Sequence, residues 1–380
     1  MRLYEYEGCK LFQSEGIPVP RYALAANPKE AREKAQEIGL PVVIKAQVLT
    51  GGRWLAGGVQ SASTPAEVEE VTRHIMENQM LGYNVQQVMV SQKVDIAKEF
   101  YVGVTVDDYH GAPVVVLSVE GGVAVNRLAR ERPESVVSKT VSMGTGLTNE
   151  EAKQMCRQVG LRSNDLTHIA NVLTALYRVF HKYDALLAEI NPIVRTKDGS
   201  YFAIDSKVEL DDSGLFRHPE LNITRESHML NDLERKGHAI GVTYVELDGD
   251  IAIIASGAGL GMASVDIINQ KMRSANFLET GGGMTEELLY KATDLVMQKK
   301  GLRALFINVY GGINPIHEGA KGIVRYLKEH NVTIPVVAKA LGNHEQETWI
   351  IFKEAGVHVA GGVSTEQAVE ELAHLLEVNK

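Results

Sequence analysis

Cysteine is scarce in this chain of 380 residues: only Cys9 and Cys156 occur, far apart in the sequence. Two isolated thiols exclude a disulfide framework and a zinc cluster built on closely spaced cysteines. We expect both to be reduced structural thiols, which agrees with a cytoplasmic location.

Long apolar runs and a basic excess are also missing. No apolar run is long enough to span a bilayer, and residues 1–7 lack the apolar core of a signal peptide. Lysine and arginine number 39 against 48 acidic residues, a net charge of −9, whereas nucleic-acid-binding proteins normally carry a basic face. We therefore expect a cytoplasmic protein that binds neither membranes nor nucleic acid.

Two hydrolase motifs are absent as well. The 12 histidines include no His-Glu-x-x-His pattern, and no Gly-x-Ser-x-Gly elbow occurs. Zinc-dependent hydrolysis and serine-hydrolase chemistry therefore have no support.

The length and the 44% hydrophobic content indicate two or three domains with ordinary cores. In the first half, helix caps and β-branched runs predict a mixture of helices and strands without a simple repeat. Helices are expected at 28–38 and 65–77 and as two segments within 150–182. Strands are expected at 41–45, 85–90, 99–106 and 112–119.

The second half alternates regularly between strands and helices. Strands are expected at 251–255, 305–310, 334–338 and 357–360, and helices from about 262, 318, 344 and 364. This alternation is typical of a parallel sheet covered by helices on both faces. The polar stretch 211–241 is interpreted as a junction, so we expect domains at 1–235 and 240–380.

Glycine clusters follow the expected parallel strands, at 256–261, 281–283, 311–314, 342–343 and 361–362. Glycine lets backbone N–H groups approach an anion, and the start of a following helix adds a favourable dipole. Several clusters at successive strand ends favour an anion site, although glycines also make ordinary turns. The first cluster resembles a dinucleotide fingerprint, but no acidic residue ends a clear second strand, which argues against a nicotinamide site.

A second region with anion-binding character lies in the first half. Lys45 ends a buried strand and is followed by Gly51-Gly52-Arg53 and Gly57-Gly58. This arrangement suits a nucleotide phosphate, although an exposed lysine at a loop is the simpler reading. Glu99 could meet a ribose or a metal, or could be a solvated strand end.

The segments 188–192 and 202–207 read as two neighbouring strands joined by a turn at 197–199. Asn191 and Asp205 would then face one cation, and oxygen ligands of this kind suit a nucleotide-bound Mg²⁺. The alternative is a structural hairpin with a polar rim. Glu189 shares the face of Asn191 by the period of two; it could orient an imidazole, or form a buried salt bridge.

Together these motifs resemble the β subunit of succinyl-CoA synthetase, in the family of nucleoside-diphosphate-forming acid–thiol ligases. The resemblance covers essentially the whole chain. Its motifs lie at 3–7, 43–47, 51–53, 56–58, 95–99, 120–122, 189–192, 215–217, 256–260, 275–278, 281–283 and 311–313.

The resemblance implies an α/β chain: an ATP-grasp domain followed by a flavodoxin-like CoA-ligase domain with a doubly wound parallel sheet. It implies a reaction of acid, CoA and ATP or GTP to acyl-CoA, ADP or GDP, and phosphate, through acyl phosphate and phosphohistidine. A partner α subunit would bind most of the CoA and carry the phosphorylated histidine, in an αβ or α2β2 assembly.

The resemblance also assigns roles to residues of this sequence. Lys45, Gly52, Arg53 and Glu99 would bind the nucleotide, with Trp54 in the same loop. Asn191 and Asp205 would bind Mg²⁺, and Glu189 would steady the partner's histidine. Ser256, Gly312, Ile313 and Asn314 would hold the acid.

Several residues depart from the family pattern. Trp54 stands where the family has glycine, and Leu55 replaces a cation near the nucleotide phosphates. Ser256 replaces an asparagine, and Asn314-Pro315 replaces a Val-Arg pair, which removes a guanidinium that can bind a carboxylate in bidentate fashion. We therefore expect an acid other than succinate, such as malate or a sulfonated acid.

Two alternatives stay open. One is a different ATP-grasp enzyme that joins a carboxylate to an amine, which would need neither the second domain nor Glu189. The other is a non-catalytic regulatory paralogue, suggested by Trp54 and Leu55.

Overall fold

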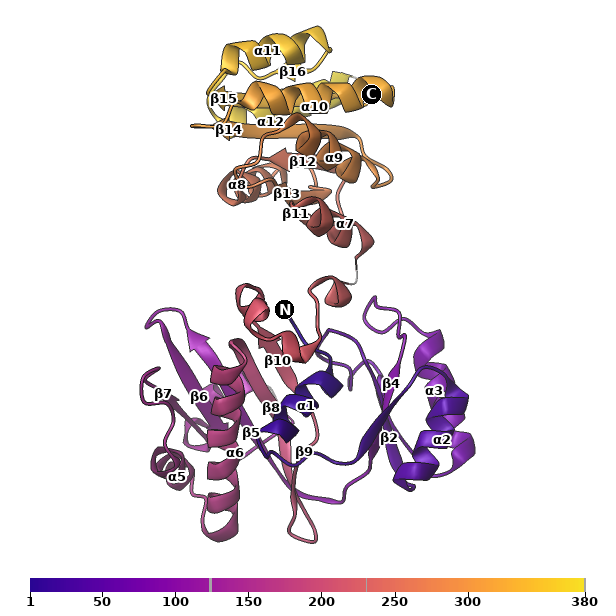
Figure 1. The fold of residues 1–380 in the computed structure, drawn as a ribbon, viewed down its shortest axis with the longest axis vertical. Coiled ribbons are helices and arrows are strands. Elements are labelled where there is room, and N and C mark those ends of the chain that lie inside the picture. The colour runs from indigo at the N-terminus through magenta and orange to yellow at the C-terminus, as the bar shows by residue number, and fades with distance from the viewer. Residues whose placement is uncertain (123–124, 230, 379–380) are drawn as a thin grey trace. The chain divides into compact units, whose positions relative to one another are not determined.

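The structure, a computed structural model, describes residues 1–122, 125–229 and 231–378. It divides into two compact units, Met1–His228 and Met229–Lys380 (Figure 1). The boundary expected from the sequence falls later, around and inside helix α7 (Asp232–Ile240). This helix packs against β11 (Thr243–Glu246) and α9 (Glu286–Met297), which places it in the second unit.

The first unit contains a four-stranded antiparallel sheet in the order β1-β4-β2-β3. Its strands are β1 (Tyr22–Ala25), β2 (Val42–Ala46), β3 (Val59–Ala62) and β4 (Val88–Gln92). Helices α2 (Pro28–Ile38) and α3 (Pro65–Glu77) pack together and against this sheet (Figure 1). Both begin as expected, with the Asn27 and Thr64 side chains accepting from the N3 amide and proline at the first helical position.

A larger sheet completes the first unit, in the order β10-β8-β5-β6-β7, with β9 also paired to β8. Its strands are β5 (Ile96–Asp107), β6 (Ala112–Ser118), β7 (Val136–Thr140), β8 (Ala185–Thr196), β9 (Tyr201–Ala203) and β10 (Lys207–Leu210). The helices are α1 (Glu5–Ser14), α4 (Val125–Glu131), α5 (Asn149–Gln158) and α6 (Ser163–Lys182). The long helix α6 packs on β5 and β8, burying Leu173, Leu176 and Phe180 in the main core.

The pairing of β8 explains why Asn191 and Asp205 come together. Strand β9 pairs with β8 at Ile193↔Ala203, and β10 pairs with it at Lys207↔Glu189. Both pairs follow one antiparallel register, so Asn191 and Asp205 lie opposite each other in the gap between the two paired stretches.

The second unit is built on a six-stranded sheet in the order β11-β13-β12-β14-β15-β16. Its parallel strands are β12 (Ile251–Ala255), β13 (Asn276–Glu279), β14 (Ala304–Gly311), β15 (Val336–Gly342) and β16 (His358–Val359), and β11 is an antiparallel edge. Counted along the chain, the parallel strands have the order 2-1-3-4-5 of flavodoxin-like folds. The predicted fold class is therefore confirmed.

Helices cover both faces of this sheet (Figure 1). They are α8 (Ala258–Ile268), α10 (Ile316–Glu329), α11 (Glu345–Glu354) and α12 (Thr365–Val378), together with α7 and α9. Ile251 and Ile253 belong to one core cluster, and Ala252 and Ile254 belong to the other. Burial on both faces explains why β12 reads as a continuous apolar run rather than an alternating one.

Two smaller findings bear on the sequence expectations. Cys9 and Cys156 are free and buried, as expected. In the described part of the chain, no helix is both long enough and apolar enough to cross a membrane.

Candidate functional site

Four charged side chains form an ionic cluster in the first unit, and three of them, Glu5, Lys45 and Arg53, are buried. Lys45 Nζ lies 2.7 Å from Glu5 Oε1 and also donates to the carbonyl oxygen of Ile204. Arg53 Nη1 lies 2.7 Å from Glu5 Oε2, and Arg53 Nη2 lies 2.8 Å from Asp205 Oδ1. The cluster thus joins β2 of the small sheet to the segment that follows β9 of the large sheet.

Separate elements hold these side chains in place. Lys45 lies near the end of β2, between its antiparallel neighbours β3 and β4. Glu5 is the first residue of α1, and the start of this helix is held by Tyr4 N, which donates to Glu7 Oε2 at 2.9 Å. Arg53 reaches back from the loop after β2, where its guanidinium also donates to the carbonyl oxygen of Ala46.

The cluster shifts the protonation of its two acids in opposite directions. Burial acts to raise the pKa of Glu5, but the adjacent charges of Lys45 and Arg53 outweigh it and the pKa is lowered. Burial together with the charge of Glu5 raises the pKa of Asp205 to about 6, although Arg53 and Lys45 oppose the rise. About 43% of the Asp205 side chain is still exposed, so this carboxylate is the member of the cluster that a ligand can reach.

The candidate metal and nucleotide ligands meet around a glycine loop. Gly122 N donates to Asn191 Oδ1 at 2.8 Å. Gly122 has a φ of +72°, and a Cβ placed on it would lie 2.8 Å from Glu99 Oε2. The structure therefore brings Glu99 and Asn191 to the same loop, although they are far apart in the sequence.

Glu189 lies on β8 opposite Gly103 and Lys207. Its carboxylate is 3.9 Å from Lys207 Nζ, and the buried Tyr101 hydroxyl hydrogen-bonds to it. Burial, followed by the Glu189 charge, raises the pKa of Tyr101 above its ordinary value. A Cβ on Gly103 would lie 2.6 Å from the Tyr101 hydroxyl oxygen, so glycine leaves the room that this phenol occupies.

The loop that carries Arg53 also presents two apolar side chains to solvent. Trp54 is 73% exposed and Leu55 is 90% exposed. Gly52 and Gly57 flank them with positive φ angles of +79° and +78°, which glycine adopts without strain.

In the second unit, the proposed acid-binding residues lie where β12 and β14 end. Ser256 Oγ accepts from Tyr310 N at 2.8 Å and donates to Tyr310 O at 3.1 Å. The Asn314 side-chain amide donates to Gly282 O, and Ile313 is 90% exposed. The residues 256 and 312–314 thus meet at the switch point between the first and third parallel strands, where open α/β sheets bind ligands.

One reason given against a nicotinamide site was wrong. A second strand does exist, because β13 ends at the acidic residue Glu279. Its carboxylate is nevertheless occupied, since Oε2 accepts from Gly281 N at 2.7 Å and Oε1 accepts from Thr243 Oγ1 at 2.8 Å. Glu279 therefore secures its own turn and the edge strand.

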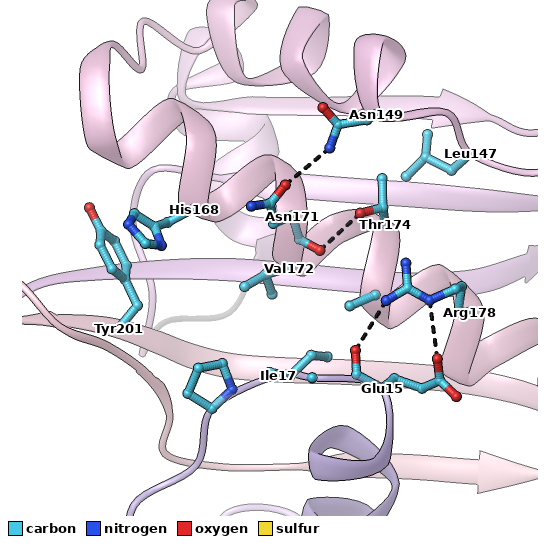
Figure 2. A pocket seen from close by; sticks show the side chains of 13 residues that line it. Glu15, Ile17, Leu147, Asn149, His168, Asn171, Val172, Thr174, Arg178 and Tyr201 are labelled. Atoms are coloured by element: carbon cyan, nitrogen blue, oxygen red, sulfur yellow. Dashed lines mark hydrogen bonds and ion pairs between the residues drawn. The ribbon is translucent and has the colours of Figure 1, made fainter.

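A separate pocket lies between α6 and the segment after α1 (Figure 2). Of the described residues that line it, none was predicted as a site residue. Its polar groups satisfy one another: Arg178 Nε donates to Glu15 Oε2 at 3.1 Å, and Asn149 Nδ2 donates to Asn171 Oδ1 at 3.1 Å. We therefore interpret this pocket as a surface depression rather than as an active site.

Sequence reasoning missed two residues of the first site. Glu5 sits in the motif at residues 3–7, but nothing local indicates that it pairs with side chains 40 and 48 positions later. Tyr101 lies two residues after Glu99 in a plain β-strand pattern, and only the strand pairing reveals its contact with Glu189.

Two family models match the chain. Residues 2–195 match an ATP-grasp domain, and residues 254–373 match a CoA-ligase domain. An ATP-grasp domain followed by a CoA-ligase domain defines an acid–CoA ligase.

Curated relatives narrow this class. The chain is 42% identical over 348 residues to a GDP-forming succinate–CoA ligase β subunit of Thermus thermophilus, covering 91% of this chain and 92% of the relative. It is 38% identical over 374 residues to an ADP-forming succinate–CoA ligase β subunit of Roseiflexus, covering 97% and 99%. The chain belongs to the succinate–CoA ligase β-subunit family.

The fold is shared with more distant proteins. An ATP citrate lyase from Methanothrix soehngenii, solved with citrate and coenzyme A, matches with a TM-score of 0.70 at 17% identity, covering 94% of this chain and 95% of that one. At this identity the likeness concerns the fold alone.

Proposed function

We propose that this chain is the catalytic β subunit of an acid–CoA ligase that forms ADP or GDP. The reaction converts acid, CoA and nucleoside triphosphate to acyl-CoA, nucleoside diphosphate and phosphate, through a phosphohistidine and an acyl phosphate. The ionic cluster of Lys45, Glu5, Arg53 and Asp205 carries this proposal. It assembles two cations and a reachable carboxylate beside Asn191, which suits a metal-bound nucleotide better than a structural salt bridge.

In this proposal Lys45 and Arg53 bind nucleotide phosphates, helped by the backbone of Gly52, while Glu99 and the Trp54 loop contact the rest of the nucleotide. Arg53 now pairs with Asp205, so phosphate binding would draw the guanidinium toward the anion and free the carboxylate. An arginine can make this exchange because its fork binds carboxylate and phosphate equally well.

The residues Asn191 and Asp205 fit Mg²⁺. Asn191 on β8 offers an amide oxygen, and Asp205, between β9 and β10, offers a carboxylate oxygen. Mg²⁺ takes oxygen ligands of this kind and shares its remaining positions with phosphate. When bound, Mg²⁺ would neutralise charge on the transferred phosphoryl group. A cation bound there would hold the Asp205 carboxyl in its ionised form, against the burial and the Glu5 charge that raise its pKa.

Glu189 is proposed to orient a histidine that the partner subunit brings to the nucleotide. A carboxylate that accepts from one imidazole nitrogen fixes the tautomer and leaves the other nitrogen free to attack phosphorus. Tyr101 supports Glu189 from the buried side. The weak 3.9 Å contact with Lys207 leaves the carboxylate available for such a partner.

The acid is proposed to bind at Ser256, Gly312, Ile313 and Asn314. Pro315 supplies no guanidinium and no N–H there, so we propose an acid other than succinate, such as malate or a sulfonated acid. The Asn314 nitrogen already donates to Gly282 O, so a substrate hydroxyl would donate to the Asn314 side-chain oxygen.

The partner is proposed to be an α subunit that binds most of the CoA, in an αβ or α2β2 assembly within the cytoplasm. The division into a nucleotide-binding domain and a CoA-ligase domain, expected at 1–235 and 240–380, belongs to the same proposal, with its limit moved to where the first unit ends. Relatives named as β subunits support the partner, and both ADP-forming and GDP-forming relatives match, which leaves ATP and GTP as candidates.

The test is to purify the chain with its partner by tagged pull-down. CoA-dependent release of ADP or GDP is then assayed over di-acids, hydroxy acids and sulfonates. Turnover that requires CoA supports the ligase, and kcat/KM highest for succinate would refute the proposed change of acid. Turnover without CoA would point to an amine-joining ATP-grasp enzyme. A complex with no turnover and no Mg-ADP binding would point to a regulatory paralogue.

A further inference from the structure

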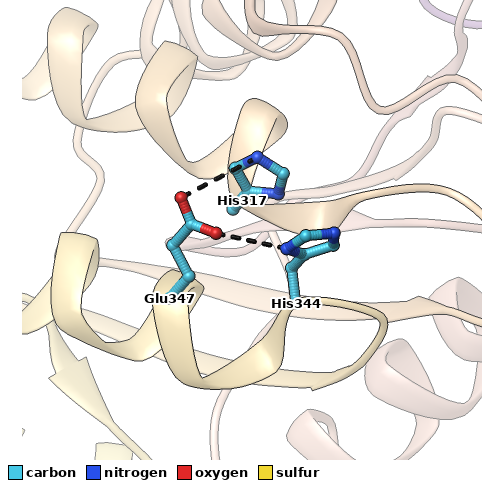
Figure 3. A group of neighbouring side chains, drawn as sticks. All are labelled: His317, His344 and Glu347. Atoms are coloured by element: carbon cyan, nitrogen blue, oxygen red, sulfur yellow. Dashed lines mark hydrogen bonds and ion pairs between the residues drawn. The ribbon is translucent and has the colours of Figure 1, made fainter.

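His317, His344 and Glu347 gather at one edge of the second unit (Figure 3). His317 lies in the first turn of α10, after β14, while His344 and Glu347 lie at the start of α11, after β15. Their potential ligand atoms are all within 4.8 Å of one another. Because β14 and β15 are adjacent parallel strands, the two helix starts meet at the same edge of the sheet.

The contacts within this group leave one buried nitrogen unsatisfied. His344 Nδ1 lies 3.2 Å from Glu347 Oε2, and His317 Nε2 lies 3.9 Å from Glu347 Oε1. Figure 3 shows the Glu347 carboxylate facing both rings from one side, and the ring centroids lie 4.4 Å apart. His317 is only 12% exposed at its side chain, and its Nδ1 is buried without a hydrogen-bond partner. A buried polar atom without a partner needs an explanation, and an ion is one of them.

The backbone at His344 is held in an unusual conformation. Its φ of +61° lies in the left-handed region, which residues other than glycine rarely adopt. Its carbonyl oxygen accepts from Thr348 Oγ1 at 2.9 Å, which helps to fix the turn. Strained positions of this kind gather at functional sites.

The helix dipoles and formal charges near the group nearly cancel, so they neither attract nor repel a cation strongly. The starts of α10 and α11 each contribute a positive partial charge of about half a unit. Glu347 and Glu318 each bring a full negative charge, and Glu318 Oε1 lies 3.0 Å from His317 Nε2. Lys321 pairs with Glu318 at 2.6 Å, so part of that charge is committed elsewhere.

We propose that His317, His344 and Glu347 bind one Zn²⁺ ion, at a site distinct from the one that Asn191 and Asp205 offer to Mg²⁺. Two imidazoles and a carboxylate are a common zinc ligand set that leaves a fourth position open. His344 and Glu347 are about half exposed, so water can fill that position.

Bound zinc would link the two loops that frame the proposed acid site. Asn343, next to His344, donates its side-chain N–H to Ile313 O at 2.8 Å. An ion between His317 and His344 would therefore hold the 311–314 loop against the turn after β15. Metal binding itself does not depend on which acid the enzyme uses.

The experiment measures Zn²⁺ binding to the purified full-length chain by equilibrium dialysis with metal analysis, in the presence of excess Mg²⁺. Co²⁺ serves as a spectroscopic substitute, because its visible absorption intensifies in a four-coordinate site. The variants are Glu347→Gln and His344→Asn, since asparagine tolerates the left-handed backbone. The control His358→Asn removes a surface histidine that pairs with Glu371 on the same unit.

We expect one zinc per wild-type chain. The first two variants should lose more than the roughly 10- to 100-fold in affinity that even an outer-shell partner contributes, and the control should bind as the wild type does. Both variants change half-exposed side chains, so their metal-free thermal unfolding should match the wild type. Absence of zinc binding, or equal binding by all variants, would overturn the proposal.

Discussion

The proposed nucleotide site of the first unit is built mainly from charged side chains, whereas the proposed acid site of the second unit is built mainly from backbone. In the first, Lys45, Arg53 and Asp205 converge from two sheets and depend on one another for charge balance. In the second, glycine loops at the ends of parallel strands expose backbone groups, and Gly311 pairs with Gly342 at the edge of the sheet. Substitutions that remove a charge should therefore disturb the first site strongly, and substitutions of glycine by alanine should disturb the second.

The largest effect is expected for Asp205→Ala. Phosphorylation of the proposed partner histidine by labelled nucleotide should fall about 1000-fold, because the proposed Mg²⁺ site loses its carboxylate ligand. The exposed Asp108→Ala serves as a control that removes an acid elsewhere in the unit. Retained phosphorylation in Asp205→Ala would show that the metal assignment is mistaken.

Glu5→Gln tests how far the first site depends on charge balance. Removing the buried carboxylate takes away the 2.7 Å ion-pair partner of Lys45, which should destabilise the first unit by about 3 kcal/mol. Thermal unfolding of the complex measures this effect. An unchanged melting temperature would mean that the cluster is not held together by Glu5.

Gly342→Ala applies the corresponding test to the second site. Gly342 has a φ of +106°, and a Cβ there would lie 2.3 Å from Gly311 O, so alanine should cost about 2 kcal/mol. Its matched control is Gly259→Ala in α8, where a Cβ meets nothing within 4 Å. The control should be neutral or slightly stabilising. If both variants were equally stable, the close approach of the Gly311 and Gly342 backbones would not be what requires glycine at this edge of the sheet.

Glu189→Gln should slow phosphoryl transfer about 10-fold while nucleotide affinity stays near the wild-type value. Tyr101→Phe keeps the ring and removes the hydroxyl, so it should give a smaller loss in the same step. Single-turnover transfer and nucleotide titration separate the two quantities. A large loss of nucleotide affinity in Glu189→Gln would contradict the proposed role.

The smallest effect concerns pH. The folded pKa of Asp205, about 6, exceeds its ordinary value, so the folded chain binds this proton more tightly. The resulting contribution to the free energy of unfolding is fully present below about pH 4 and is lost as the pH rises through about 6. Allowing for solvent screening at this partly exposed group, we expect about 1 kcal/mol. Without nucleotide and metal, Asp205→Asn should flatten this part of the stability–pH curve; an unchanged curve would contradict the shift.

Local pattern was enough to predict much of the fold and some of the site geometry. The parallel strands could be predicted because burial on both faces makes each of them a continuous apolar run. The antiparallel register of one hairpin was enough to place Asn191 opposite Asp205. Strand β13 was missed because it has four residues and opens with Asn276, a polar residue that is buried and bonded to the backbone of Ile253. The start of α8 was placed too late because glycines occupy its first turn; a Cβ on Gly261 would lie only 2.6 Å from Phe277.

The contacts between distant segments could not be read in the same way. Glu5 pairs with Lys45 and Arg53 only because α1 packs beside both sheets. Likewise, Asn149, Asn171 and their neighbours line one surface pocket only because tertiary packing brings their segments together.

The exposed indole of Trp54 gives the chain an intrinsic optical probe. Only two tryptophans occur, and Trp349 is anchored by a hydrogen bond from its indole nitrogen to Ala340 O at 2.6 Å in the other unit. Fluorescence from the solvent-facing Trp54 should be quenched by iodide far more readily than that from Trp349. A loss of quenching on adding nucleotide would report, without any label, that the loop has closed over its ligand.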